Sequence, residues 1–304
     1  MVSSPYNQSM TSTQHIAVLG TGALGTLIAW YCRSQELFTI NRNQQERFSL
    51  LEYGASEPTL FSSTSWQGTP VDWLIVTTKA ASTLTALKGI ESQLSAVKNL
   101  LLLQNGMGQQ AEVAQWLETQ HSAPQLWVGS STEGAYHAEE GHVVHAGKGH
   151  TVIGPWQHEC VEQADKLPPS MTLSPDIHKV LNEKLAINAI INPLTAYYQC
   201  YNGELLSNAD YRHHFDTLST EVDELFKQLN WNTDFSIPQR AEQVALATAQ
   251  NRSSTYQDVL HRRPTELPYI CGYLLKQAAQ YDLSAPLTTE LFTSLSATEA
   301  TWSA

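Results

Sequence analysis

A glycine-rich turn directly after a short apolar segment is the feature that most constrains this chain. Residues 15–20 read His-Ile-Ala-Val-Leu-Gly, an apolar run that predicts a buried parallel strand. In a G-x-G-x-x-G turn the first glycine permits the bend, the second lets the backbone approach a pyrophosphate, and the third brings helix and strand together. Because the turn follows a strand and opens a helical pattern, we predict that it binds a dinucleotide at a helix N-terminus. The six residues that fit this pattern are Gly20, Thr21, Gly22, Ala23, Leu24 and Gly25.

Apolar strands and amphipathic helices alternate through the rest of the first half. This alternation predicts a parallel, doubly wound sheet of the Rossmann type. We expect helices at residues 23–34, between the last two of the first four strands, and after Gly106. The expected strands are residues 15–20, 37–40, 71–78 and 99–103, followed by 127–131 and 142–145.

The second half of the chain has a different pattern, in which long amphipathic helices predominate. A length of 304 residues exceeds the usual size of one domain, about 100–200 residues, so two domains are expected. The fold class is therefore α/β: an N-terminal Rossmann domain followed by an all-helical C-terminal domain. Expected helices cover 179–192, 211–229, 239–250 and 268–281, and the expected parts are a flexible leader over 1–14, a nucleotide-binding domain over 15–178 and a helical substrate domain over 179–304.

The end of the second expected strand bears on which nicotinamide cofactor is bound. Enzymes that use NAD place an acidic residue about 20 residues beyond the glycines, where it binds the ribose hydroxyls. Here the stretch is Thr-Ile-Asn-Arg-Asn, with Arg42 and no carboxylate. A guanidinium can hold a 2′-phosphate as a fork, so the position favours NADP over NAD, although most loop arginines are simply solvated.

Two more polar residues follow strands of the expected sheet. Loops at the carboxyl ends of parallel strands line the cofactor crevice. Lys79 therefore either meets a phosphate or ribose there, or lies exposed at a helix start. Asn105 has an amide near the expected nicotinamide position, or is an ordinary turn asparagine before glycine.

The segment from Lys184 to Pro193 combines a strongly apolar helix with a polar ladder. Lys184, Asn188 and Asn192 recur every four residues, which puts them on one face of a helix. Pro193 is expected to end or kink that helix just after Asn192. The ladder is either a solvated stripe or a polar face that lines a cleft.

The net charge and the cysteines limit the classes of binding partner and the cellular compartment that we expect. The net charge of −12 argues against nucleic acid and anionic membranes as partners, so a small molecule is expected. The four cysteines are widely separated, which suggests reduced thiols in a cytoplasmic protein, and no metal site is predicted. The polar residues 1–14 lack the features of a signal peptide, and no transmembrane helix is expected. The oligomeric state, monomer or homodimer, is left open.

The motifs taken together resemble one enzyme family. Beside the glycine turn and the Thr-Thr-Lys that ends at Lys79, they include Gln-Asn-Gly-Met-Gly at 104–108 and Lys-Leu-Ala-Ile-Asn-Ala-Ile-Ile-Asn-Pro at 184–193. Ser-Ser-Thr-Tyr-Gln-Asp at 253–258 and Thr-Glu at 265–266 follow in the same order. From about residue 15 to about residue 290 the chain is similar to the ketopantoate reductase (2-dehydropantoate 2-reductase) family.

This resemblance implies a reaction and a set of residue roles. The reaction is reduction of 2-dehydropantoate to (R)-pantoate by NADPH, on the route to pantothenate and coenzyme A, in a cleft between the two domains. Alone, Ser254 would be read as a helix cap and Glu266 as a solvated surface group. By position, the resemblance implies that Lys184 is the catalytic general acid, Glu266 an active-site glutamate, Asn188, Asn192 and Ser254 substrate-binding residues, Asn105 a residue near both nicotinamide and substrate, and Arg42 and Lys79 NADP-binding residues.

Four positions depart from the family pattern and leave the exact 2-oxo acid open. One alternative is therefore an NADP-dependent reductase of another 2-oxo or hydroxy acid with the same architecture. Another is a non-catalytic NADP-binding module. The departures are Ser82, Arg252, Thr255 and Cys271.

Overall fold

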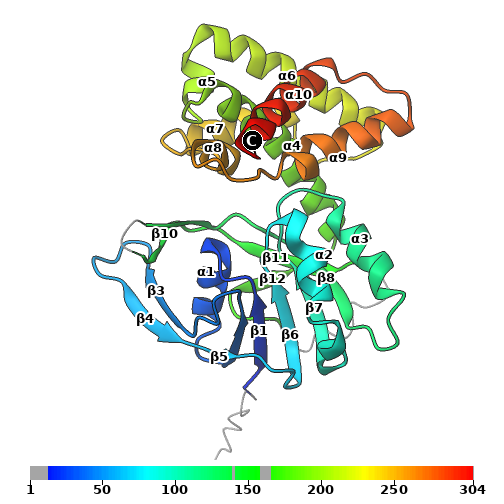
Figure 1. The fold of residues 1–304 in the computed structure, drawn as a ribbon. Coiled ribbons are helices and arrows are strands. Elements are labelled where there is room, and N and C mark those ends of the chain that lie inside the picture. Colours follow the sequence, from blue (N-terminus) through cyan, green and yellow to red (C-terminus); the bar gives the residue numbers. More distant parts are fainter. Residues whose placement is uncertain (1–12, 139–140, 158–165, 304) are drawn as a thin grey trace, which may run out of the picture.

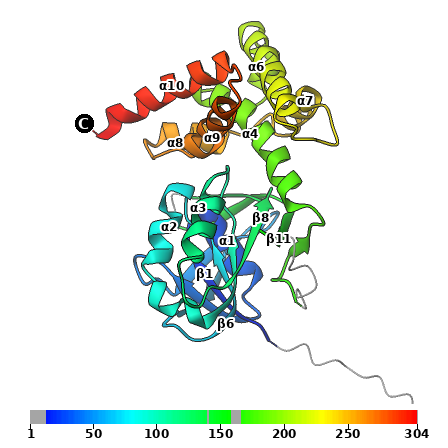
Figure 2. The same cartoon turned by 90° about the vertical axis from the view of Figure 1, so that its right-hand side faces the viewer.

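A computed structural model describes residues 13–138, 141–157 and 166–303. The first half forms a sheet with helices packed on it, and the helices of the second half lie above the sheet as a separate layer (Figure 1). A view turned by a quarter shows that α4 (Ile177–Tyr198) rises from the sheet into the helical layer (Figure 2). The α/β fold class and its two-part architecture are confirmed.

Within the described residues, the main sheet has eight strands in the order β12-β11-β8-β7-β6-β1-β2-β5. Six neighbouring strands, from β8 to β5, run parallel, whereas β11 is antiparallel to β8 and parallel to β12. The carboxyl ends of β1, β2, β6 and β7 therefore meet at one edge, which faces the helical layer. The strands are β1 (His15–Leu19), β2 (Glu36–Ile40), β5 (Thr64–Ser65), β6 (Val71–Val76), β7 (Val97–Leu102), β8 (Gln125–Ser131), β11 (Thr151–Pro155) and β12 (Met171–Leu173).

Alternate residues of each central strand face opposite layers of helices, as the two-residue period of a strand requires. Ile16 packs in one apolar cluster with Ile28 of the first helix. Ala17 packs in another cluster with Leu87 and Val113 of the second and third helices. Both faces of the sheet are therefore covered, which explains why its strands read as continuous apolar runs. The helices are α1 (Ala23–Tyr31), α2 (Ala80–Lys88) and α3 (Gln109–Leu117), and a 3-10 turn covers Glu91–Ala96.

A second sheet covers the outer side of α1. It has the order β4-β3-β10-β9, and buried Leu50 and Val143 from it pack on Leu27 and Trp30 of α1. Only the strand at 142–145 was expected from the sequence. The elements are β3 (Arg47–Leu51), β4 (Thr59–Ser62), β9 (Gly134–His137) and β10 (Val143–Gly147).

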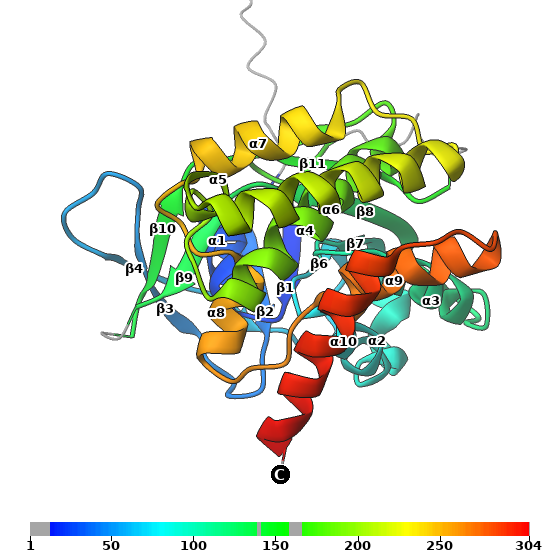
Figure 3. The same cartoon turned by 90° about the horizontal axis from the view of Figure 1, so that it is seen from above.

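The second half is a bundle built around α4, which contacts α6, α7, α8, α9 and α10. Seen from above, these helices cover the carboxyl edge of the main sheet (Figure 3). Their bounds are α5 (Glu204–Ser207), α6 (Ala209–Gln228), α7 (Ile237–Ala247), α8 (Ser254–Leu260), α9 (Leu267–Gln280) and α10 (Pro286–Ala300), with a 3-10 turn at Thr301–Ser303.

Of the two outcomes expected at Pro193, an end or a kink, the end is ruled out, since α4 continues to Tyr198. A proline inside a helix removes one backbone hydrogen bond and costs about 3 kcal/mol. The turn around it is buried, and Thr195 Oγ1 donates hydrogen bonds to the carbonyl oxygens of Ile191 and Asn192. Burial of this turn on several sides offsets the lost bond, because helices in proteins are held mainly by packing.

Several element boundaries also differ from expectation. The first helix ends at Tyr31 rather than residue 34, and the helices α8 and α10 were not predicted. Gln14, assigned to the leader, is buried and donates from Nε2 to the Lys166 carbonyl oxygen. Leader residues 1–12 and Cys160 lie outside the described residues. Within the described part, no helix combines the length and the apolar character needed to cross a membrane.

Candidate functional site

The glycine turn has the close contacts that its sequence predicts. Gly20 has a φ of 93°, and its N–H donates to the Ile40 carbonyl oxygen at 2.9 Å. A Cβ on Gly25 would lie 1.9 Å from the Gly20 carbonyl oxygen, so only glycine lets α1 pack this near the turn. A Cβ on Gly22 would meet nothing within 4 Å, so open space adjoins the backbone there. No side chain caps this end of α1, and no acidic residue lies in its first turn.

Arg42 lies beside this turn. The hydrogen bond from Gly20 to Ile40 ties the end of β2 to the turn, so Arg42, two residues further on, is exposed at the same edge. The amide of the neighbouring Asn41 forms hydrogen bonds within its own loop instead, since it both donates to and accepts from the backbone of Gln45. Arg42 is therefore the side chain available to a ligand at the end of β2.

Asn105 and Glu266, from opposite halves of the chain, are in direct contact. Asn105 Nδ2 donates to Glu266 Oε2 at 2.9 Å, and the Ala80 N–H at the start of α2 donates to Oε1 at 3.4 Å. Burial raises the pKa of Glu266, and these two hydrogen bonds oppose the rise. The carboxylate of the helical half is thus held between two strand ends of the sheet.

The backbones of the two halves also meet here. The Met107 N–H donates to the Tyr269 carbonyl oxygen at 2.7 Å. A Cβ on Gly106 would lie 2.4 Å from that same oxygen, and the φ of Gly106 is 77°. The loop after β7 and the first turn of α9 therefore approach so closely that the position between them requires glycine.

Lys79 is part of the contact between the halves. Its Nζ lies 2.7 Å from Asp258 Oδ2 and donates to the Pro264 carbonyl oxygen at 2.7 Å. Asp258 also accepts from Arg263 Nε at 3.1 Å, and its side chain is 10% exposed. Sequence reasoning did not single out Asp258, because one acidic residue in an amphipathic helix carries no signal of its partner.

Lys184 is held at the junction of the two halves. Its Nζ donates to the Ser131 carbonyl oxygen at the end of β8, at 2.6 Å. Burial lowers the pKa of Lys184 to about 8, and the negative charge of Glu266 opposes this drop. Desolvation is the dominant cause, because an ammonium loses its hydration among the apolar side chains of α4. Ser131 was expected only as a strand residue.

The other ladder residues follow on α4. Because α4 is continuous over the whole segment, its four-residue spacing puts Asn188 and Asn192 on the face that carries Lys184. Asn188 is half-buried and Asn192 is buried. The hydroxyl groups of Thr195 and Ser253 are hydrogen-bonded at 2.7 Å, which ties the start of α8, with exposed Ser254, to α4.

The four positions that depart from the family pattern differ in their exposure. Cys271 and Thr255 are buried, and Cys271 packs in the apolar core of the helical half. Ser82 lies in the first turn of α2, and Arg252 is exposed with its guanidinium over the rings of Tyr201 and Tyr256. Of the four departures, Arg252 is the exposed one, and it lies two residues before Ser254 in the sequence.

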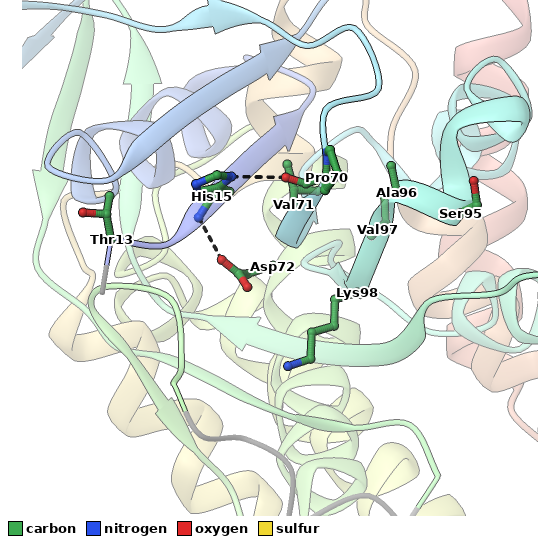
Figure 4. Close-up of a pocket in the computed structure, with 9 residues that line it drawn as sticks. All are labelled: Thr13, His15, Pro70, Val71, Asp72, Ser95, Ala96, Val97 and Lys98. Atoms are coloured by element: carbon green, nitrogen blue, oxygen red, sulfur yellow. Dashed lines mark hydrogen bonds between the residues drawn. The ribbon is translucent and has the colours of Figure 1, made fainter. Parts of the chain in front are cut away.

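A pocket of about 480 Å³ lies at the opposite edge of the sheet, where β1, β6 and β7 begin (Figure 4). There the His15 N–H donates to Asp72 Oδ2 at 2.9 Å. The pocket contains no residue predicted for binding or catalysis, and its lining is Thr13, His15, Pro70, Val71, Asp72, Ser95, Ala96, Val97 and Lys98. The functional cluster is instead at the carboxyl edge, as expected for open α/β sheets.

Family comparisons agree with the arrangement of the two halves. Residues 16–158 match the family described as Ketopantoate reductase PanE/ApbA, and residues 176–299 match Ketopantoate reductase PanE/ApbA C terminal. The two matches together cover most of the chain, one for each half of the structure.

Individual relatives and solved structures resemble this chain over nearly its whole length. The 2-dehydropantoate 2-reductase of Vibrio cholerae is 31% identical over 299 residues, covering 95% of this chain and 99% of the relative. The crystal structure of the probable 2-dehydropantoate 2-reductase of Bacillus subtilis has a TM-score of 0.75 at 28% identity, covering 93% of this chain and 99% of that one. A ternary structure of D-mandelate dehydrogenase with NADH and anilino(oxo)acetate has a TM-score of 0.82 at 19% identity, covering 95% and 99%, a likeness of fold alone.

Proposed function

The chain belongs to the ketopantoate reductase family, and from this premise we propose that it reduces 2-dehydropantoate to (R)-pantoate with NADPH, on the route to pantothenate and coenzyme A. The observation that carries the proposal is the position of Lys184, a half-buried lysine with a lowered pKa at the junction of the two halves. In a 2-oxo acid reductase, such a group is needed beside the ketone oxygen.

The residues at the carboxyl edge fit a dinucleotide. The open space beside Gly22 and the uncapped N-terminus of α1 suit a pyrophosphate, which binds to free backbone N–H groups. Exposed Arg42, with no acidic residue at the end of β2, suits a 2′-phosphate. We assign cofactor binding to the glycine turn, Arg42, Lys79 and Asn105, with Lys79 shared between the cofactor and Asp258.

Lys184 provides the proton in this reaction. When bound, NADPH supplies the hydride to the ketone carbon. Negative charge then develops on the ketone oxygen, and the ammonium of Lys184 stabilises that charge and donates a proton to it. A lysine pKa near 8 suits this role better than the usual value of about 10.4, because the proton is given up more easily near neutral pH.

The remaining polar residues orient the substrate in this proposal. Asn188, Asn192 and Ser254 bind its hydroxyl and carboxylate groups with neutral side chains. Glu266 helps keep Lys184 protonated and holds Asn105 in place. A substrate enclosed between the two halves is protected from bulk water.

The test is NADPH oxidation with 2-dehydropantoate and a panel of other 2-oxo acids. We expect 2-dehydropantoate to give the highest kcat/KM. The variant Lys184→Ala should lower kcat by about two to four orders of magnitude without loss of folding. Near wild-type turnover in this variant would refute the role of Lys184. Saturable NADPH binding without oxidation by any oxo acid would instead indicate a non-catalytic module.

The cofactor preference has its own test. Arg42→Ala should raise KM for NADPH by about tenfold or more, because a charge-assisted bidentate contact is lost, and should leave KM for NADH nearly unchanged. A wild-type preference for NADH would overturn the assignment of Arg42.

We also place the reaction in the cytoplasm. Cys32, Cys200 and Cys271 are free and buried, as expected in a reducing compartment.

A further inference from the structure

A buried polar cluster lies beside α1, outside the residues assigned above. Glu133, just beyond β8, and His145 of β10 are paired at 2.8 Å, with side chains only 7% and 6% exposed. Tyr31 donates its hydroxyl to Glu133 Oε1 at 3.1 Å. The Gly149 N–H donates to Oε2 at 3.0 Å. Such groups are rarely buried unless hydrogen bonds or ion pairs compensate for the loss of their hydration.

The cluster fixes one carboxylate from three sides. His145 Nε2 faces two acceptors, Glu133 Oε2 and the Gly147 carbonyl oxygen at 3.1 Å, so this nitrogen carries the hydrogen. Glu133 therefore accepts from the phenol of Tyr31 on α1, and from an imidazole and a backbone amide of the stretch from β10 to Gly149. A glutamine has one acceptor atom, so it could accept from His145 and Gly149 only by turning its NH2 group toward the Tyr31 hydroxyl, which would then have to accept rather than donate.

The segment that this carboxylate fixes is the one that holds Lys184. Glu133 is two residues from Ser131, and its own N–H donates to Ser131 Oγ at 3.3 Å. The residues just before β11 also bind this segment, because the Thr132 N–H donates to the His150 carbonyl oxygen at 2.9 Å. A Cβ on Gly149 would lie 2.3 Å from the carbonyl carbon of Thr132, so the two backbones touch.

Among the described residues, the Ser131 carbonyl oxygen is the hydrogen-bond acceptor of Lys184 Nζ. An ammonium has three N–H donors, so one bond to the protein leaves two for a substrate oxygen. The direction of those two depends on where the Ser131 carbonyl is held. Its position depends in turn on the segment that Glu133 anchors.

We propose that Glu133 is a positioning residue for Lys184, acting through the Ser131 carbonyl, with His145 and Tyr31 holding its carboxylate in place. This inference rests on the proposed role of Lys184 as the proton donor. A misplacement of about 1 Å at a reacting group can lower a rate by about a hundredfold, so a small shift of this segment matters.

The first measurement needs no substrate and uses a double-mutant cycle. Urea unfolding is followed for wild type, Glu133→Gln, Lys184→Met and the double variant. We expect Glu133→Gln to lower the urea midpoint more in the wild-type background than in the Lys184→Met background. An equal drop in both backgrounds would show that Glu133 is merely structural, whatever reaction the protein catalyses.

The second measurement uses turnover of 2-dehydropantoate. We expect Glu133→Gln to lower kcat by about 10- to 100-fold with little change in KM for NADPH. The alkaline limb of kcat/KM should move to lower pH, because a carbonyl acceptor favours the charged form of Lys184. An unchanged limb together with an unchanged kcat would overturn the proposal.

Two variants keep these measurements interpretable. Asp72→Asn removes a carboxylate that accepts the His15 N–H at the far edge of the sheet, and should lower the midpoint equally in both backgrounds without moving the limb. Tyr31→Phe removes one of the three donors to Glu133 and should give a smaller change in the same direction as Glu133→Gln. If Glu133→Gln does not fold, the cycle with Tyr31→Phe decides, and additivity there would equally refute the proposal.

Discussion

Replacing Lys184 with methionine should stabilise the protein near neutral pH, and the gain should shrink as the pH rises. Burial lowers the pKa of Lys184 from 10.5 to about 8 in the folded protein. In the unfolded chain a lysine keeps a pKa of about 10.4. Between these two values the unfolded state binds more protons than the folded state, so the stability of the wild type rises with pH.

The magnitude follows from the size of the shift. About 2.5 pKa units at 1.36 kcal/mol each correspond to about 3 kcal/mol, which burial of the charge costs the folded state. This cost is fully present below the folded pKa of about 8 and disappears as the pH passes the unfolded pKa. From about pH 7 to about pH 9.5 the wild type should regain about 2 kcal/mol, which a variant without the ammonium cannot.

The assay is urea unfolding of wild type and Lys184→Met at several pH values across this range. Lys184→Met also removes the hydrogen bond to the Ser131 carbonyl, which changes the free energy of unfolding by an amount that does not depend on pH. The test is therefore how the difference in unfolding free energy between the variant and the wild type changes with pH. Lys98→Met, which removes an exposed ammonium at the far edge of the sheet, controls for the loss of one positive charge from an acidic chain. A difference between Lys184→Met and wild type that stays constant over the range would refute the reasoning.

Two further predictions concern the contacts between the halves. Glu266→Gln should move the alkaline limb of kcat/KM below about pH 8, because the charge of Glu266 raises the pKa of Lys184; a limb that moves upward would contradict this. Gly106→Ala should destabilise the protein by more than about 1–2 kcal/mol, the penalty for a left-handed residue, because its Cβ would also strike the Tyr269 carbonyl. Gly54→Ala has a similar φ of 82° with nothing within 4 Å, so thermal unfolding that shows equal losses for both variants would exclude the steric cause.

The sheet could be predicted from sequence because its strands are buried on both faces. Residues 15–19 and 71–76 read as apolar runs for that reason. Three of the four strands of the second sheet gave no such signal; β4 (Thr59–Ser62), for example, is short and mostly exposed. Helix α4 passed beyond Pro193 because packing outweighed the local preference of proline, and packing cannot be read from spacing.

The candidate site was predicted in part. The ladder on α4 was visible because a four-residue spacing of polar groups in an apolar helix is unusual. The pairing of Asn105 with Glu266 joins residues 161 positions apart, and the partner of Lys79 is 179 positions away from it, so no local pattern reports either contact. Ser131 contributes only its backbone carbonyl, which every residue type has, and sequence could not distinguish it.

The uninterrupted path of α4 has a consequence for which substrates can be selected. A helix rises 1.5 Å per residue, so the side chains at 184, 188 and 192 start from points spaced about 6 Å apart along one rigid axis. In the function proposed above, the helix therefore sets fixed distances between the proposed proton donor, Lys184, and the two asparagines. A substrate whose second polar group lies too near its ketone, or too far from it, would not reach the side chains of Asn188 and Asn192 while its ketone is at Lys184. The proposed selection by substrate length would thus depend on the backbone of α4 as well as on the side chains that it carries.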